Sequence, residues 1–195
     1  MADDSLFRWI VVAGFVATVA IALPHRIRAG TRERLDRRKE GMFILATLRP
    51  AGAALWMGVI AYMLNPSSMA WSAVALPPAL RWSGALLTAL GILLTAWTMP
   101  TLGRNLTDTV VTREEHTLVT RGPYRWIRHP FYVSMAFVSF GAALLAANWF
   151  IFAFAVAVFG LLAVRSRVEE EQLALKFGQA YRDYQERTGR FLPKM

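Results

Sequence analysis

Residues 116–132 read His116-Thr-Leu-Val-Thr-Arg-Gly-Pro-Tyr-Arg-Trp-Ile-Arg-His-Pro-Phe-Tyr132 and lie between two long apolar runs. They hold two of the chain's three histidines, together with three arginines and two tyrosines. Gly122-Pro123 marks a turn, and Pro130 suits the first turn of a helix, where its missing N–H costs nothing. The helix that follows His129 is therefore expected to present free N–H groups and a positive dipole end that can hold an anion. We expect chemistry where this cationic segment meets the apolar runs.

The composition indicates a membrane protein with one domain, residues 1–195. Of these residues 55% are hydrophobic and 18% are charged, and the charged residues cluster between the apolar runs. The net charge of +9 therefore fits cationic loops that face the cytoplasm and its anionic lipids better than it fits a nucleic-acid surface. The absence of cysteine excludes disulfides, thiolate catalysis and zinc held by cysteine. We expect membrane lipids as partners, no nucleic acid and no obligate protein partner.

Five apolar segments are predicted to cross the membrane, namely residues 6–23, 42–64, 79–99, 131–147 and 149–164. The first has 18 residues, close to the ~20 that a helix needs to span the hydrocarbon. Pro24 and Pro100 are expected to lie at the ends of the first and third segments. Only Asn148 separates the last two segments, which predicts a tight helical hairpin, with one long buried helix as the alternative.

The chain turns polar at Arg165, and we predict an amphipathic C-terminal helix on the cytoplasmic side. Leu173, Phe177, Tyr181 and Tyr184 recur at spacings of 4, 4 and 3, which is one face of a helix. The predicted fold is thus an all-α integral membrane protein with about five transmembrane helices and this C-terminal helix. Residues 1–100 would supply three of the transmembrane helices, and residues 101–195 the catalytic half.

The distribution of cations predicts the orientation. Seven Lys or Arg lie in residues 25–41, five in residues 101–128 and seven after Val164, whereas the N-terminus has one and residues 65–78 have none. Five spans with the N-terminus outside place all three cationic segments in the cytoplasm. The central segment and the tail then share one face of the membrane. Arg49, inside the second apolar segment, either reaches back to the cytoplasmic interface or has a role in a site.

Several familiar sites are missing from the sequence. It contains no G-x-G-x-x-G, no phosphate-binding loop and no histidine pair with metal-ligand spacing, so neither a Rossmann cofactor site nor a metal site is predicted. Taken singly, the arginines of residues 116–132 are also explained as determinants of topology, and the tyrosines as interfacial aromatic residues. The three glutamates from Glu169 to Glu171 are likewise explained as stabilising a helix N-terminus. Composition alone therefore supports only a five-span membrane protein.

The central segment resembles the signature of the isoprenylcysteine carboxyl methyltransferase family. That signature is His-x-Leu-Val-x-x-Gly-x-Tyr followed by Arg-His-Pro-x-Tyr. The tail also matches, in Glu169-Glu170, in Phe177-Gly178 and in Arg190-Phe191-Leu192-Pro193. The resemblance covers about residues 101–193, whereas the first two spans match no family pattern.

The resemblance implies methyl transfer from S-adenosylmethionine in a pocket on the cytoplasmic side that is not a Rossmann fold. The positions that it assigns to the cofactor site are His116, Leu118, Val119, Gly122, Tyr124, His129, Pro130, Tyr132, Glu169 and Glu170. Arg128 falls on the arginine that the family implicates in catalysis, and Glu170 is the second predicted catalytic residue. Either Glu169 or Glu170 is expected to contact the cofactor.

The chemistry of these residue types agrees with the resemblance. A cationic loop suits the carboxylate of S-adenosylmethionine, a glutamate suits its ammonium or ribose, and aromatic faces suit its adenine. Transfer then requires alignment and dehydration of the nucleophile. Arg128 would orient a carboxylate nucleophile without removing a proton. The expected acceptor is lipophilic or prenylated and carries a carboxylate of the isoprenylcysteine type, a thiol or a lipid amine.

Two other functions remain as alternatives. Membrane sterol reductases that use NADPH carry altered forms of the same motifs, usually with Asn before the tyrosine where this chain has Phe131. A non-catalytic membrane scaffold or lipid-binding protein would explain the basic loops equally well.

Overall fold

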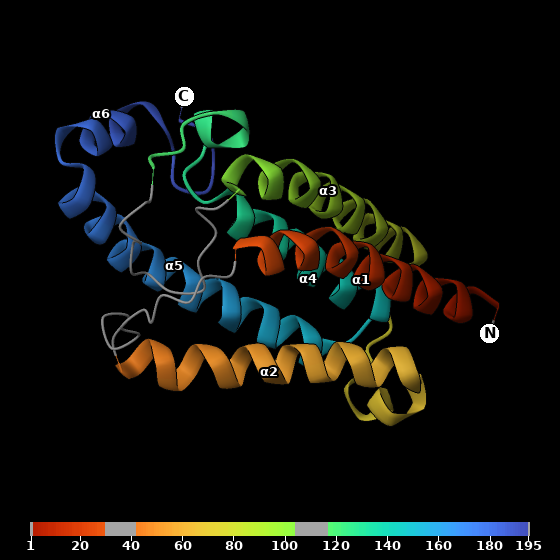
Figure 1. Ribbon diagram of the computed structural model, residues 1–195. Helices are drawn as coiled ribbons and strands as arrows, with labels where there is room; N and C mark the ends of the chain where they lie inside the picture. Colours follow the sequence, from red (N-terminus) through yellow and green to blue (C-terminus); the bar gives the residue numbers. More distant parts are fainter. Residues whose placement is uncertain (1, 30–41, 104–116, 195) are drawn as a thin grey trace.

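The computed structural model describes residues 2–29, 42–103 and 117–194, and the regular elements in these ranges are helices (Figure 1). In chain order they are α1 (Ala2–Ala29), α2 (Met42–Leu64), the 3-10 helix η2 (Pro66–Ser72), α3 (Pro78–Leu102), the 3-10 helix η4 (Gly122–Arg125), α4 (Pro130–Ala146), α5 (Trp149–Phe177) and α6 (Gln179–Arg187). Each of the five apolar segments forms a helix. The all-helical class is therefore confirmed.

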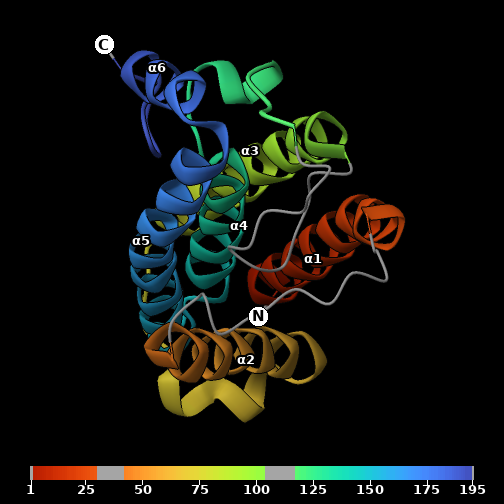
Figure 2. The ribbon, with the colours of Figure 1, turned by 60° about the vertical axis from the view of Figure 1, so that its left-hand side comes forward.

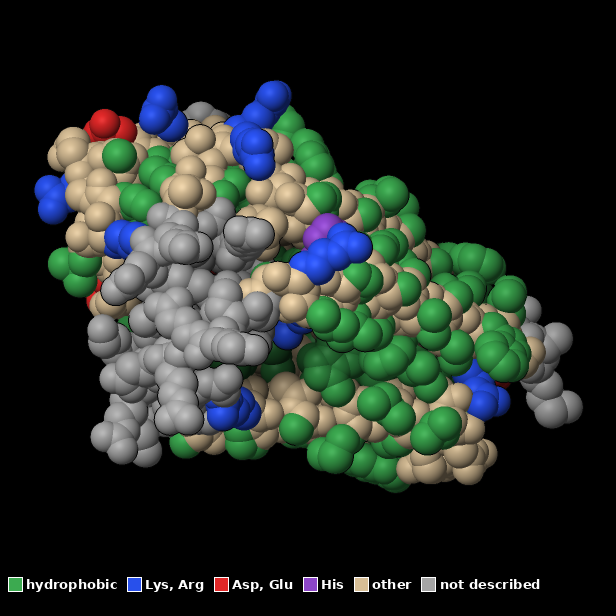
Figure 3. Space-filling model, viewed as in Figure 1, with side chains coloured by type: hydrophobic (Ala, Val, Ile, Leu, Met, Phe, Trp, Pro, Cys, Tyr) green, Lys and Arg blue, Asp and Glu red, His purple; other side chains and the backbone are tan. Residues whose placement is uncertain are grey.

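Among the residues that the structure describes, three helices are long and apolar enough to cross a membrane. They are α1 over Asp4–Ala29, α3 and α5, and α4 is a shorter apolar helix. Large apolar side chains point outward from them, with Val16, Leu93 and Val156 exposed to 56%, 66% and 49%. Figure 3 shows hydrophobic side chains along the middle of the molecule and most of the Lys and Arg side chains in the half that carries α6. The count of five crossings stays a prediction.

Two helices run past the prolines that were expected to end them. Pro24 lies inside α1 and Pro100 inside α3. An interior proline removes one backbone hydrogen bond and bends the helix, yet membrane helices tolerate it because neighbouring groups satisfy the freed carbonyl. Both helices therefore extend further than predicted, toward the end of the molecule that carries α6 (Figure 1).

Small residues bring α3 and α4 into close contact. A Cβ atom added at Gly84 would lie 2.8 Å from the carbonyl oxygen of Gly141, and one at Gly91 would lie 2.9 Å from that of Ser134. Glycine at these positions lets two membrane helices approach along their backbones. Because α4 is held in this way, the residues at its start, His129 and Pro130, have a fixed place.

The predicted hairpin between α4 and α5 is confirmed. Ala147 adopts a left-handed backbone with φ of 47°, and the Asn148 side chain accepts a hydrogen bond from Ile151 N at 3.1 Å, which caps the start of α5. Asn148 Nδ2 also donates to Ser72 Oγ at 2.8 Å, which ties the hairpin to η2. The alternative of one long helix is thus wrong. Because α5 runs back along α4, its C-terminal end returns to the start of α4 (Figure 2).

The tail differs from its prediction in one respect. The residues after Arg165 continue α5 to Phe177, and a separate helix, α6, begins only at Gln179. Gly178 lies between them with φ of 57°, a conformation that favours glycine and ends helices. Leu173 and Phe177 therefore belong to α5, whereas Tyr181 and Tyr184 belong to α6, and the four do not form one helical face. The short amphipathic C-terminal helix is α6 alone.

Candidate functional site

The central segment and the tail meet through their backbones. Gly189 N donates to Trp126 O at 3.1 Å, and Arg128 N donates in return to Gly189 O at 2.9 Å. His129 N then donates to Arg190 O at 3.1 Å. Ile127 and Gly189 form an isolated parallel bridge as a result. Two regions about 60 residues apart in the sequence thus form one structural unit at the end of the helical bundle, as the predicted two-part site requires.

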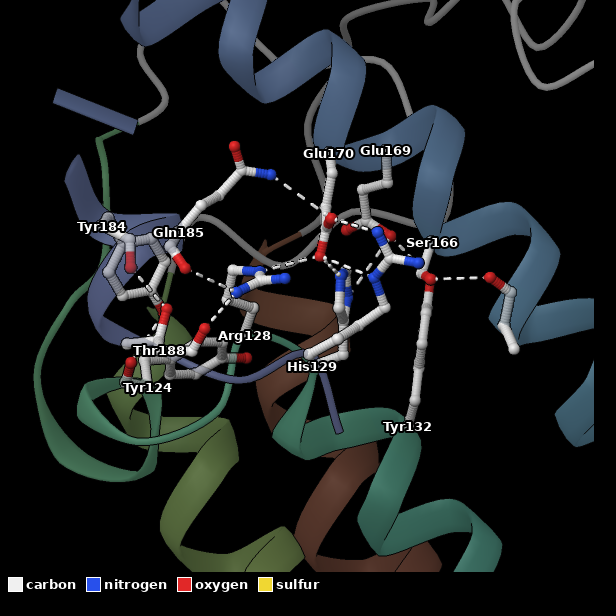
Figure 4. Close-up of polar contacts among 12 residues, drawn as sticks. Tyr124, Arg128, His129, Tyr132, Ser166, Glu169, Glu170, Tyr184, Gln185 and Thr188 are labelled. Atoms are coloured by element: carbon white, nitrogen blue, oxygen red, sulfur yellow. Dashed lines mark hydrogen bonds and ion pairs between the residues drawn. The ribbon is translucent and has the colours of Figure 1, made fainter. Parts of the chain in front are cut away.

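The Glu170 carboxylate is the centre of this unit (Figure 4). Arg128 Nε donates to its Oε1 at 2.8 Å, and His129 Nε2 lies 3.1 Å from the same oxygen. Arg190 holds both oxygens, with Nε 3.1 Å from Oε1 and an Nη2 contact of 2.6 Å to Oε2. Gln185 Nε2 donates to Oε2 at 3.3 Å. Glu170 is 4% exposed, so these contacts replace its hydration.

The electrostatics of this cluster favour an ionised Glu170. Burial disfavours the charged carboxylate, but hydrogen bonds from cationic groups favour it more strongly. Two guanidinium groups, those of Arg128 and Arg190, make such bonds. The buried charge is therefore paired, and the pairing holds the end of α5 against the start of α4 and the tail.

Arg128 also anchors the tail. Its Nη1 donates to the carbonyl oxygen of Gln185, in the last turn of α6, at 3.3 Å. It also donates to the carbonyl oxygen of Thr188, the residue that follows α6. Thr188 Oγ1 donates to Tyr184 O at 2.6 Å, and the Tyr184 hydroxyl donates to Tyr124 O at 2.6 Å. Burial raises the pKa of Tyr184 and of Tyr124 above the usual range, so both hydroxyls stay protonated. The 3-10 helix η4 is thereby fastened to α6.

Glu169 occupies a different environment from its neighbour. The Tyr132 hydroxyl donates to Glu169 Oε2 at 2.8 Å, and His129 Nδ1 lies 4.0 Å from the same oxygen. The rings of His129 and Tyr132 stack, with centroids 5.2 Å apart and planes inclined by 12°. The Glu169 side chain is 27% exposed. It is the accessible carboxylate of the pair.

The other predicted site residues lie around this cluster. Gly122 has φ of 59°, and a Cβ atom there would meet Thr101 Oγ1 at 2.8 Å, which explains the glycine. Pro130 begins α4 as predicted and is fully buried. Leu118 and Val119 are partly buried in the segment before the turn. His116 lies outside the described residues.

The start of α4 is less open than the sequence suggested. His129 N is bonded to Arg190 O, and both Tyr132 N and Val133 N donate to His129 O. A tail carbonyl therefore accepts from the N–H group of His129, which was among those expected to face an anion. A cation on a side chain, not the helix end, is the better partner for an anion at this place.

Sequence reasoning missed three residues of the unit, Gln185, Thr188 and Arg190. Arg190 belongs to the C-terminal motif Arg190-Phe191-Leu192-Pro193 that matched the family, but nothing in the sequence paired it with Glu170. Thr188 and Gln185 bind Arg128 through backbone carbonyls, which leave no signature in the sequence, and nothing in the sequence paired the Gln185 side chain with Glu170. Among the described residues, no group of His, Asp and Glu has the arrangement of a metal site.

Residues 84–176, which include the Arg-His-Pro-x-Tyr segment and the glutamate pair, match the model of the isoprenylcysteine carboxyl methyltransferase family. Over these residues the chain matches that family. Proteins named protein-S-isoprenylcysteine O-methyltransferase are similar to it. The one from Mus musculus is 36% identical over 118 residues, which cover 57% of this chain and 40% of the relative. The one from Dictyostelium discoideum is 32% identical over 117 residues, which cover 58% of this chain and 49% of the relative.

A solved structure of a eukaryotic intramembrane Ras methyltransferase of the isoprenylcysteine carboxyl methyltransferase family has a similar fold. The TM-score is 0.56 at 30% identity, over 74% of this chain and 51% of that chain. The chain thus spans about half the length of the relatives it matches. With its long apolar helices, this likeness identifies an integral membrane protein. These findings give no support to a sterol reductase or to a scaffold.

Proposed function

We propose that the chain transfers a methyl group from S-adenosylmethionine to a lipophilic carboxylate of the isoprenylcysteine type at the cytoplasmic face of a membrane. One observation carries the proposal. The family resemblance assigns cofactor binding to the Arg-His-Pro-x-Tyr segment and to the Glu169-Glu170 pair. These two parts meet in one network, although 37 residues separate Tyr132 from Glu169 and 42 separate Arg128 from Glu170. A scaffold has no need for such a network at the end of its bundle.

The residues present fit S-adenosylmethionine. Glu169 is an accessible carboxylate with room for a further donor, as an ammonium or a ribose hydroxyl requires. Tyr181 is 1% exposed, and its hydroxyl has no hydrogen-bond partner among the described residues. A buried hydroxyl without a partner is costly, which supports a ligand that would satisfy it. His129 and Tyr132 supply a stacked aromatic pair beside Glu169.

The contacts divide the roles of the two glutamates. Both oxygens of Glu170 already accept hydrogen bonds from Arg128, Arg190 and Gln185. We therefore assign the cofactor contact to Glu169 and a positioning role to Glu170. The catalytic roles predicted for Arg128 and Glu170 remain untested, and we propose them in this indirect form, in which the pair fixes the groups that face the ligands.

When bound, S-adenosylmethionine would supply a methyl group activated by a positively charged sulfur, and the acceptor carboxylate oxygen would take this methyl group while the thioether sulfur left with the electron pair of the broken S–C bond. The protein's task is alignment and exclusion of water, because a carboxylate nucleophile has no proton to lose. A thiol or an amine would require a base as well. The bound tail, which covers the start of α4, keeps water from this region.

The acceptor is expected to be lipophilic and to arrive from the bilayer. The network lies at the end of a bundle whose helices expose large apolar side chains to their surroundings. Phe131 and Val133, apolar neighbours of the motif, are the residues that we expect to face its path, whereas Ile127, which was also expected there, is only 8% exposed.

A methylation assay on purified protein in nanodiscs tests the proposal. The protein is given labelled S-adenosylmethionine with a farnesylated cysteine, a lipophilic thiol or phosphatidylethanolamine. We expect base-labile methyl ester from the first acceptor alone. Saturating S-adenosylhomocysteine, at about 100 times its dissociation constant, should stabilise the protein by about 2.7 kcal/mol. Stabilisation by NADPH instead would favour a reductase, and stabilisation by neither ligand a scaffold.

A further inference from the structure

Arg190 is the most accessible cation of the network. Its side chain is 34% exposed, compared with 11% for Arg128 and 5% for His129. The tail backbone fixes its position, because its carbonyl accepts from His129 N at 3.1 Å. Arg190 is therefore a cation held at the surface of an otherwise buried cluster.

The guanidinium of Arg190 forms hydrogen bonds along one edge only, within the described residues. Nε and Nη2 face the two oxygens of Glu170 at 3.1 and 2.6 Å. A planar guanidinium carries five N–H donors and has a second edge, formed by Nη1 and the other hydrogen of Nη2. No hydrogen bond within the described residues engages Nη1. Arg128 contrasts with it, because its Nε and Nη1 are committed to Glu170 and to the carbonyls of the tail.

Apolar rings lie next to this cation. Phe191, the following residue, has its ring centroid 5.4 Å from that of Phe159 and 5.7 Å from that of His129. Phe159 belongs to the apolar part of α5. A cationic donor edge thus stands beside a row of rings that continues toward the membrane-facing part of the bundle. This is the arrangement that an anionic head with a lipophilic tail requires.

We propose that the outer edge of Arg190 binds the carboxylate of the methyl acceptor, while its inner edge is held by Glu170. The proposal rests on the proposed function and deepens it, since it makes Arg190 the residue that selects an anionic acceptor. Two parallel hydrogen bonds from a guanidinium recognise a planar carboxylate better than a single ammonium does. Glu170 then orients the fork without touching the acceptor, and the acceptor's chain extends along Phe191 and Phe159.

The test compares Arg190→Gln and Arg190→Lys with the wild type. Arg182→Gln serves as the matched control. Arg182 is exposed on α6, and its substitution removes the same charge from the same tail. Two inhibitors that compete with the farnesylated cysteine acceptor, N-acetyl-S-farnesylcysteine (itself a competing acceptor) and its carboxamide, report the preference for a carboxylate. Methylation kinetics with a farnesylated cysteine and thermal stabilisation by S-adenosylhomocysteine complete the set.

We expect the wild type and Arg182→Gln to prefer the carboxylate inhibitor. Arg190→Gln should raise the acceptor KM roughly 10- to 100-fold, as expected for lost hydrogen bonds to a charged group, and remove the preference for carboxylate over carboxamide. Arg190→Lys should retain only part of that preference, while stabilisation by S-adenosylhomocysteine persists in both variants. A merely structural role would weaken both inhibitors equally.

An undiminished preference in Arg190→Gln would overturn the inference. Loss of stabilisation by S-adenosylhomocysteine in both variants would also overturn it, because Arg190 would then serve the methyl donor. If the wild type methylates no farnesylated cysteine, the proposed function itself is wrong and the inference goes with it. If Arg190→Gln does not fold, the two inhibitors decide the question on Arg190→Lys.

Discussion

Arg128 donates from Nε to Oε1 of Glu170 at 2.8 Å, and so the residue before His129 is bonded to one near the end of α5. The same guanidinium reaches the carbonyl of Thr188 beyond α6. Three parts of the chain therefore meet at one side chain. A substitution that breaks the Arg128–Glu170 pair should therefore loosen the start of α4, the end of α5 and the tail together.

Arg128→Lys should loosen the tail. Lysine keeps the positive charge but offers a point charge in place of a fork, and it cannot serve Glu170 and the tail carbonyls at once. We expect stability to fall by about 2 kcal/mol, the range for hydrogen bonds to charged groups, and S-adenosylhomocysteine to bind more weakly. Thermal melting and ligand-induced stabilisation measure both effects. An unchanged melting temperature with slow methyl transfer would instead give Arg128 a direct role on the acceptor.

Glu170→Gln should be among the most damaging changes in the chain. The carboxylate is 4% exposed and is the shared partner of Arg128, Arg190 and His129. An amide of the same shape leaves buried cations without their counter-charge, which costs about 3–5 kcal/mol. Thermal melting in detergent measures the loss.

Glu169→Gln is the matched control for that change. The two residues are neighbours, but the Glu169 side chain is 27% exposed and accepts a hydrogen bond from the neutral Tyr132. We expect a small change in melting temperature and a large loss of S-adenosylhomocysteine binding. The reverse pattern, with Glu170→Gln tolerated and Glu169→Gln unfolded, would contradict the roles assigned here.

Much of the fold was predictable because the bilayer constrains it. The apolar segments gave the helices α1 to α5, and Asn148 indicated the hairpin, since an asparagine between apolar runs is typical of a helix cap. The meeting of the central segment with Glu169 and Glu170 followed from the family resemblance and the cation count. The contacts Tyr132–Glu169 and Arg128–Glu170 confirm that meeting.

Other features had no signal in the sequence. The parallel bridge between Ile127 and Gly189 and the bonds from Arg128 to tail carbonyls use backbone atoms, which any residue provides. The change to polar residues at Arg165 predicts a new helix, but residues 165–177 contain no glycine or proline, so α5 continues through them to Phe177. Arg190 was missed because the pairing of one carboxylate with two guanidiniums depends on the tail's path.

Removal of the residues after Phe177 should abolish binding of the methyl donor but leave the membrane helices intact. The truncation takes away α6, Gln185 and Arg190, which hold Glu170 and cover the start of α4. We expect the shortened protein to insert and to keep the helix content of α1 to α5, with no stabilisation by S-adenosylhomocysteine. Circular dichroism and thermal melting check the two parts. Normal stabilisation would show that the tail is not part of the site.

The orientation is tested by reporter fusions. The 65–78 region and α6 lie at opposite ends of the bundle (Figure 1). Seven cations follow Val164 and none lies in residues 65–78, so we expect the C-terminus in the cytoplasm and Asn65 outside. A phosphatase fused at Asn65 should be active, and a fluorescent protein at the C-terminus should fluoresce. An external C-terminus would overturn the predicted location of the site.

Tyr132→Phe should weaken ligand binding at Glu169 while it leaves the fold largely intact. The change removes the hydroxyl that donates to Glu169 Oε2 at 2.8 Å but keeps the ring that stacks on His129. Without this donor Glu169 is free to turn, and we expect roughly tenfold weaker binding of S-adenosylhomocysteine, with stability lower by about 1 kcal/mol. A double-mutant cycle with Glu169→Gln isolates the contact, because the second change should add little once the first has been made. Fully additive losses in binding would show that Tyr132 and Glu169 act on the ligand independently.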